Sequence, residues 1–192
     1  MQNISDMQRE VNLPDATAGV VQIIDNTADA RIWGIEAEVQ AQLHENLTFT
    51  GNIGVLSSKY KEVRFDISSD GVVNEADTLL ELPRLAPLTW GVGLLYDADT
   101  DWGAIFASVN FNHRDLSYYT DNNNGFLNAA DMVDANVTVE FMDGAMAFSV
   151  YGKNLLNEVT YGGDSALPFG PGHTFSPLNK GRVYGAELQY RF

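Results

Sequence analysis

The amino-acid sequence predicts an all-β fold, an antiparallel meander of about eight strands. Three observations support this prediction. Apolar residues recur at every second position along most of the chain, as expected of strands whose successive side chains point to opposite faces. No segment repeats with the period of a helix. The connections between the expected strands alternate between short and long.

The first three strands are expected near residues 3–10, 29–43 and 47–61. The first is the weakest, because only Ile4 and Met7 are strongly apolar. The second alternates most regularly, with Trp33, Ile35, Ala37, Val39, Ala41 and Leu43 on one face and Glu36, Glu38 and Gln40 on the other. A short extended piece at residues 20–24 is expected to belong to a loop.

The remaining strands are expected near residues 84–96, 102–117, 131–141, 145–154 and 182–192. The fifth strand opposes Ile105, Ala107, Val109 and Phe111 to Ser108, Asn110, Asn112 and Arg114. The sixth opposes Val133, Ala135, Val137, Val139 and Phe141 to Asp134, Asn136, Thr138 and Glu140. Each of these strands therefore has one apolar and one polar face.

The lengths of the connections favour a transmembrane β-barrel. Residues 44–46, 97–101 and 142–144 make tight turns, whereas residues 11–28, 62–83, 118–130 and 155–181 are long and rich in Gly, Asp, Asn and Pro. In an antiparallel meander the short turns then lie at one end and the long loops at the other, as in outer-membrane barrels. The predicted lumen-facing residues are Glu36, Glu38, Gln40, Asn110, Asn112, Arg114, Asn136 and Glu140.

Composition excludes several other classes of protein. Lys and Arg total 11 against 26 Asp and Glu, so a nucleic-acid partner is not expected. The absence of cysteine excludes disulfides, thiolate metal sites and thiol catalysis. The sequence has no apolar run long enough for a transmembrane helix, and its first residues do not resemble a signal peptide.

No catalytic or cofactor site is predicted. The three histidines, His44, His113 and His173, lack the spacing of metal ligands. The sequence HRDL at residues 113–116 resembles part of a kinase catalytic loop, but Thr120 occupies the position of the required Asn. We therefore expect no enzyme, no cofactor and no metal.

Four segments, in order along the chain, resemble TonB-dependent outer-membrane receptors: NTADARIWGIEAEV, LPRLAPLTWGVGLLY, YGKNLLNEVTY and RVYGAELQYRF. The resemblance implies a section of a 22-stranded barrel in the outer membrane, which in this family surrounds a plug and imports iron chelates, cobalamin or sugars. We accordingly expect residues 1–192 to form a single C-terminal barrel segment without plug or signal peptide.

The resemblance also implies partners. Outer-membrane lipid would cover the apolar face, and a periplasmic energy-transducing protein would act through an N-terminal part outside this chain. The small-molecule substrate is unknown. The final strand resembles the signal read by the barrel assembly machinery, carried here by Gly185, Leu188, Tyr190 and Phe192.

Two other architectures fit the alternation of apolar and polar residues. Eight strands can close into a complete small outer-membrane barrel with a filled interior. A soluble β-sandwich that binds a ligand also alternates in this way, although it gives no reason for the sorted lengths of the connections.

Overall fold

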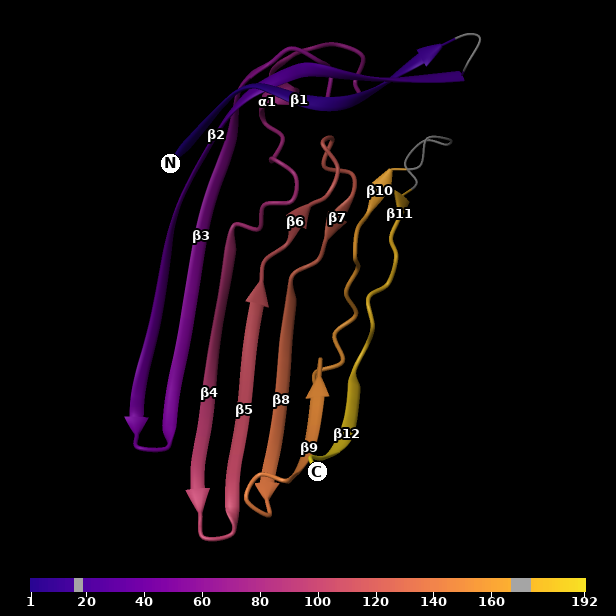
Figure 1. The fold of residues 1–192 in the computed structure, drawn as a ribbon. Helices are drawn as coiled ribbons and strands as arrows, with labels where there is room; N and C mark the ends of the chain where they lie inside the picture. The colour runs from indigo at the N-terminus through magenta and orange to yellow at the C-terminus, as the bar shows by residue number, and fades with distance from the viewer. Residues whose placement is uncertain (16–18, 167–173) are drawn as a thin grey trace.

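The computed structural model describes residues 1–15, 19–166 and 174–192. They form one antiparallel eight-stranded sheet in the order β1-β2-β3-β4-β5-β8-β9-β12, with two small two-stranded sheets, β6-β7 and β10-β11 (Figure 1). The predicted all-β meander is therefore confirmed.

The strands of the large sheet follow one another along the chain. They are β1 (Gln2–Asp15), β2 (Gly19–His44), β3 (Leu47–Val63), β4 (Leu88–Thr100), β5 (Gly103–Arg114), β8 (Ala130–Phe141), β9 (Met146–Lys153) and β12 (Val183–Tyr190). The small sheets contain β6 (Ser117–Tyr118), β7 (Phe126–Leu127), β10 (Ser165–Ala166) and β11 (Thr174–Phe175).

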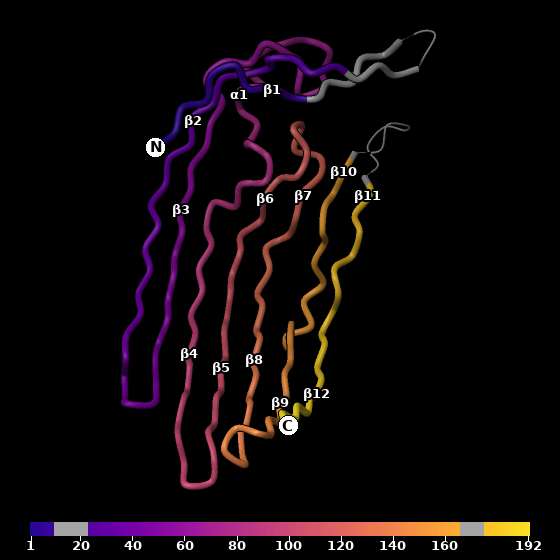
Figure 2. Tube along the Cα trace, in the orientation of Figure 1, coloured from indigo at the N-terminus to yellow at the C-terminus, as the bar shows by residue number. Residues whose placement is uncertain are grey.

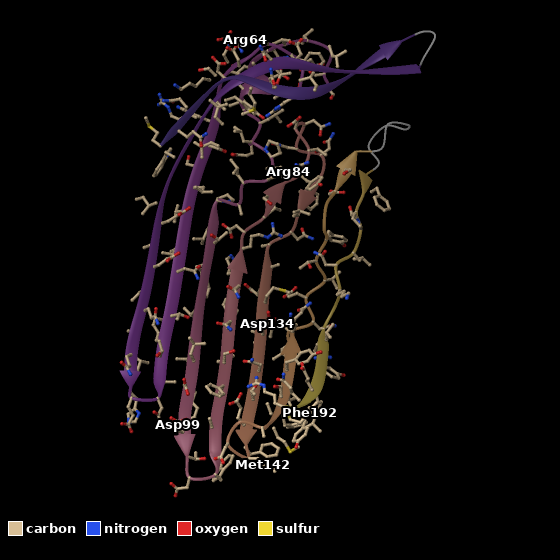
Figure 3. All side chains as sticks on the ribbon, viewed as in Figure 1. Arg64, Arg84, Asp99, Asp134, Met142 and Phe192 are labelled. Carbon is tan, nitrogen blue, oxygen red and sulfur yellow. The ribbon has the colours of Figure 1, made fainter. Side chains whose placement is uncertain are left out.

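The short turns lie together at one end of the sheet, as predicted. The turns that join β2 to β3, β4 to β5 and β8 to β9 are all at the lower end in Figure 1, and the long connections are at the upper end. Figure 3 places Asp99, Met142 and Phe192 at the short-turn end and Arg64 and Arg84 at the loop end.

The first hairpin is longer than predicted. Residues 20–24, expected in a loop, belong to β2, and their backbone pairs with residues 10–14 of β1. Backbone hydrogen bonds hold this extension, and such bonds do not require the apolar alternation on which the prediction relied. The extension lies across the loop end of the sheet (Figure 1), and the strands of the sheet body run side by side below it (Figure 2).

The strand expected at 84–96 begins and ends four residues later than predicted, and the strand expected at 182–192 is shorter than predicted. β4 begins only at Leu88, because Arg84 has a left-handed backbone (φ 64°) and Pro87 has no N–H to donate. β12 ends at Tyr190, which pairs with Met146, the first residue of β9. Beyond this pair the partner chain turns through Met142 and Asp143, so Phe192 lies past the strand and is fully exposed.

A small core lies at the loop end of the sheet. The buried residues Ala28, Ala30, Tyr60, Ile67 and Leu82 pack together there. They come from β2, β3 and the loop at residues 64–87, which contains the only described helix, α1 (Glu75–Thr78). No helix in the described residues is long and apolar enough to cross a membrane. The sequence pattern did not predict α1, because four residues are too few to show a period.

The sheet is open. In the described part of the chain β1 pairs only with β2 and β12 only with β9, so the two edge strands do not meet. The alternative of a closed eight-stranded barrel is therefore not what this chain forms. A sandwich needs two large stacked sheets, and the described residues build one, so that alternative is wrong as well.

Candidate functional site

All eight predicted lumen-facing residues lie on one face of the sheet. Strand pairing places Glu36 and Arg114 in one cross-strand row, Glu38 and Asn112 in the next, and Gln40 and Asn110 in a third. Asn136 and Glu140 lie on the same face of β8, in rows nearer the short turns. We call this surface the polar face. That it lines a barrel lumen stays a prediction.

Two glycines of β4 leave room for asparagine side chains on the polar face. A Cβ atom at Gly93 would lie 2.5 Å from Asn110 Oδ1, and one at Gly91 would lie 2.7 Å from Asn112 Oδ1. The two amides therefore reach across β4 in space that any larger residue would fill. Sequence alternation did not single out these glycines, because glycine carries no face preference.

Polar side chains on this face also contact one another. Ser108 hydrogen bonds to Asn136, its partner across β5 and β8, and the hydroxyl oxygens of Thr138 and Ser149 lie 2.8 Å apart. A hollow of about 520 Å³ lies over these strands. The surface is hydrophilic and has its own hydrogen-bond network, as the wall of an aqueous passage requires.

The opposite face is apolar and largely exposed. One row across it runs through Leu47, Tyr96, Ala107, Val137, Val150 and Ala186. Val137 is 46% exposed and Val150 48%. Exposed apolar surface of this extent indicates contact with another apolar phase or partner.

The long loops contact one another above the polar face. The N–H of Arg84 donates to the carbonyl of Tyr118 at 2.6 Å, and the Arg84 guanidinium lies 4.7 Å from the centre of the Tyr119 ring. Asn123 exchanges two hydrogen bonds with the backbone of Glu81. These contacts join the loop at residues 64–87 to the loop at residues 115–129.

The last long loop joins the same assembly. Asp164 accepts a hydrogen bond from the N–H of Phe126 at 2.7 Å and a second from the hydroxyl of Ser176. Gly125 packs against the backbone of Asp164 so closely that a Cβ there would lie 2.1 Å from the Asp164 carbonyl oxygen. Asp164 was not predicted as a site residue, because an Asp in a loop carries no periodic signal.

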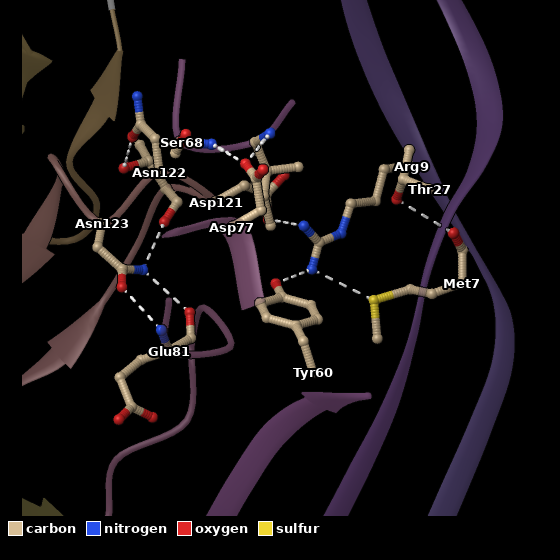
Figure 4. Close-up of polar contacts among 12 residues, drawn as sticks. Met7, Arg9, Thr27, Tyr60, Ser68, Asp77, Glu81, Asp121, Asn122 and Asn123 are labelled. Atoms are coloured by element: carbon tan, nitrogen blue, oxygen red, sulfur yellow. Dashed lines mark hydrogen bonds and ion pairs between the residues drawn. The ribbon is translucent and has the colours of Figure 1, made fainter. Parts of the chain in front are cut away.

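Arg9 joins the first hairpin to these loops (Figure 4). Its Nη1 lies 3.0 Å from Asp121 Oδ1, an ion pair without hydrogen-bond geometry, and its Nη2 donates to Tyr60 Oη and to Met7 Sδ. The Arg9 side chain is only 9% exposed, whereas that of Asp121 is 39% exposed. Sequence reasoning missed this pair, because its members are far apart in the chain.

A cavity of about 590 Å³, which we call the loop-end cavity, lies beneath the loops at the edge of the polar face. Asn112 and Arg114 of β5 form part of its floor, and Arg84, Tyr119 and Tyr161 contribute from the loops. Arg114 is held by Ser117 Oγ at 3.0 Å and by the carbonyl of Asn128 at 3.1 Å. Of the predicted lumen-facing residues, Asn112 and Arg114 are the two at this cavity.

His113, between these two residues, has its side chain on the other face. The ring stacks on Trp90 with 5.8 Å between ring centres, and its nitrogens contact Asp131 Oδ1 at 2.6 Å and Asp115 Oδ1 at 3.0 Å. These carboxylates therefore pair with the histidine rather than with the arginines of the cavity.

The four residues of the predicted assembly signal all lie at the β12 edge. Leu188 and Tyr190 share the apolar face, and Phe192 follows with its ring centre 6.0 Å from that of Tyr190. Gly185 lies on the polar face, where a Cβ would lie 2.6 Å from the hydroxyl of Tyr151. Whether another protein recognises these residues stays a prediction.

Comparison with known families identifies this architecture. Residues 2–155 match the family described as TonB dependent receptor-like, beta-barrel. The chain belongs to this family. The predicted resemblance is thereby confirmed, and its basis extends over more than half of the sequence.

Three solved receptor structures share the fold. The ferric yersiniabactin uptake receptor FyuA from Yersinia pestis superimposes with a TM-score of 0.77 at 18% identity, over 99% of this chain and 26% of the receptor. BauA, the ferric preacinetobactin receptor from Acinetobacter baumannii, gives 0.64 at 14% identity, over 94% and 25% of the two chains.

The siderophore receptor PiuA from Acinetobacter baumannii gives a TM-score of 0.65 at 10% identity, over 97% of this chain and 24% of the receptor. The chain thus spans about a quarter of the length of these three receptors. No curated protein sequence matches it.

Proposed function

We propose that this chain forms part of the wall and external loops of an outer-membrane receptor that imports a ferric siderophore. The family match over residues 2–155 carries the proposal. The ligands named for the three similar structures favour a siderophore over the cobalamin or sugar that other family members take up. The activity is non-covalent binding and transport rather than catalysis.

The two faces of the sheet support a barrel wall. The exposed apolar face would contact outer-membrane lipid, and the polar face with Glu38, Asn112 and Asn136 would line the lumen. The loop-end cavity would then lie on the extracellular side, where a substrate arrives. Energy would come from a periplasmic TonB partner, acting through a part of the receptor other than these residues.

Uptake by cells tests this function. We expect deletion of the gene to abolish energy-dependent uptake of at least one radiolabelled ferric siderophore under iron limitation, and a plasmid copy of the gene to restore it. Uptake that is unchanged for every siderophore offered, together with loss of cobalamin or sugar uptake, would overturn the choice of substrate class.

A further partner is the barrel assembly machinery. The apolar spacing of Leu188, Tyr190 and the exposed Phe192 supports recognition of the chain end by strand addition. We expect deletion of Phe192 from the complete protein to lower its level in the outer membrane several-fold, although this residue makes no strand pair. The control is Trp102→Ala, which removes an exposed aromatic side chain at the turn between β4 and β5 and leaves the chain end intact. Normal surface levels without Phe192 would contradict the proposal.

A further inference from the structure

We propose that the loop-end cavity binds the carboxylate groups of an anionic ferric chelate through Arg84 and Arg114. This inference rests on the proposed function and names the class of substrate. Two observations carry it: the charge of the residues that line the cavity, and the way in which the two arginines are held.

The cavity is positive in a strongly negative chain. The sequence has 26 acidic and 11 basic residues, yet among the described residues two arginines and no Asp or Glu line this cavity. Asp115 and Asp131, the nearby carboxylates, contact His113 on the opposite face. An anion that reaches the cavity therefore lies close to two guanidinium charges and to no carboxylate of the described lining.

Neither arginine has a carboxylate partner among the residues that the structure describes. In the part of the chain that the structure describes, ion pairs of arginine involve only Arg9 and Arg64. Arg114 donates only to neutral oxygens of Ser117 and Asn128. These acceptors fix its guanidinium and leave its positive charge available to a ligand.

Arg84 is held in an uncommon conformation. Its φ of 64° lies in the left-handed region, which non-glycine residues rarely occupy and which recurs at functional sites. Its N–H donates to the Tyr118 carbonyl, and its guanidinium lies over the ring of Tyr119. Two loops together thus direct this side chain to the edge of the cavity.

The chemistry of the lining residues matches a carboxylate. A guanidinium presents a planar pair of N–H donors that fits the two oxygens of a carboxylate, and such charge-assisted pairs are about twice as strong as neutral hydrogen bonds. Tyr119, Tyr161 and Asn179 add neutral hydrogen-bonding groups around the two charges. A cationic chelate would meet two like charges in the same space.

Direct binding tests this inference. Equilibrium dialysis of the complete protein in detergent would compare ferric citrate, an anionic carboxylate chelate, with ferrioxamine B, a cationic hydroxamate chelate. We expect tighter binding of ferric citrate, weakened by added salt. We expect the variant R84Q/R114Q to lose about ten-fold or more of that affinity and none of its affinity for ferrioxamine B.

Matched variants separate charge from structure. The variant K59Q/K61Q makes the same charge change on β3, outside the cavity, and is expected to bind like the wild type. The variant R84K/R114K keeps the charge but not the planar fork, and is expected to fall between the two. Preference for ferrioxamine B, binding of neither chelate, or an equal response of both chelates to R84Q/R114Q would overturn the inference.

The outcomes distinguish this inference from the proposed function. Uptake in cells of a cationic siderophore alone would support the proposed function and overturn the proposal that the cavity binds anions. The protein could instead bind ferric citrate through the arginines while deletion of its gene alters no siderophore uptake. That result would support the anion-binding cavity and overturn the proposed function.

Discussion

Val137 and Thr138 are neighbours in β8 and face opposite environments. Val137 lies in the apolar row between Ala107 and Val150, and it is 46% exposed. Thr138 lies on the polar face, with its hydroxyl 2.8 Å from that of Ser149. If the apolar face contacts lipid, the same substitution should have very different consequences at the two positions.

We expect Val137→Arg to lower the free energy of unfolding in lipid by about 2–4 kcal/mol, because the charge would enter the hydrocarbon region. Thr138→Arg should be tolerated, since Asn136 and Glu140 share its face. Urea unfolding of the complete protein in vesicles measures the free energy of unfolding of both variants. With a fluorophore at each position, lipid-soluble quenchers should reach position 137 and not position 138. Equal quenching would contradict the assignment of faces.

At the scale of single residues, the sequence predicted well on which face of the sheet a side chain lies, and predicted poorly which distant residues are in contact. Alternation assigned Glu36, Asn110 and Asn136 to one face because side-chain direction in a strand follows from position alone. It could not find Arg84, whose importance depends on a left-handed backbone and on contacts between loops. Alternation did not identify Gly93 either, because this glycine leaves space for a side chain of another strand.

At the scale of elements, Asp77 organises the loop at residues 64–87. Its side chain is fully buried and accepts three backbone hydrogen bonds, from Ile67 at 2.8 Å, Ser68 at 2.7 Å and Asn74 at 2.8 Å. Burial alone would raise the pKa of this carboxyl, but the three N–H donors outweigh burial and hold the pKa below its ordinary value of 3.8.

The lowered pKa of Asp77 predicts that the loop loses order in acid. A carboxyl with a lowered folded pKa stabilises the fold fully above its unfolded pKa, and the stabilisation is lost as pH falls through the folded pKa. The loop should therefore be ordered at neutral pH and loosen below about pH 4. A spin label on Cys introduced at the exposed Val72 would report the change as increased mobility.

We expect Asp77→Asn to loosen the loop already at neutral pH and to remove the acid transition, because the amide cannot accept from all three donors without placing its own N–H against one of them. Loss of such hydrogen bonds costs about 1–3 kcal/mol. The exposed Glu75→Gln, on the same helix, is the control. An acid transition that persists in Asp77→Asn would show that another group controls the loop.

The elements themselves were predictable where an apolar face defines them. The strands of the sheet body, such as β5 and β8, were placed to within a few residues. The outer part of the first hairpin and α1 were missed, because backbone pairing in one case and the Asn74 capping box in the other hold them without a long apolar pattern.

At the scale of the whole molecule, the ion pair between Arg9 and Asp121 holds the first hairpin to the loops. We expect Asp121→Ala to destabilise this junction by less than the roughly 3–5 kcal/mol of a fully buried pair, because Asp121 is 39% exposed. Arg9→Ala should cost more, because it also removes the hydrogen bonds to Tyr60 and Met7, and the double variant should cost little more than Arg9→Ala, since the pair is lost only once. Hydrogen exchange of β1 peptides measures this, and additive losses would contradict the coupling.

The open edges of the sheet predict how the isolated chain behaves. β1 and β12 each leave one side without a strand partner in the described residues, and exposed edges pair with other chains. In a receptor about four times as long, further strands would occupy these edges. We therefore expect the 192-residue chain alone in detergent to associate through its edges, and the complete protein to be monodisperse.

Sedimentation and cross-linking test this expectation. With Cys at Ile4 and at Ala186, on the two edge strands, a short bifunctional reagent should join different copies of the isolated chain and should not join the two sites within one copy. A closed eight-stranded barrel would bring the strands together and give the intramolecular product. If the isolated chain were a monodisperse, protease-resistant monomer that gave the intramolecular cross-link, eight strands would suffice to close the sheet. The edges of β1 and β12 would then not be edges that further strands of a larger barrel occupy.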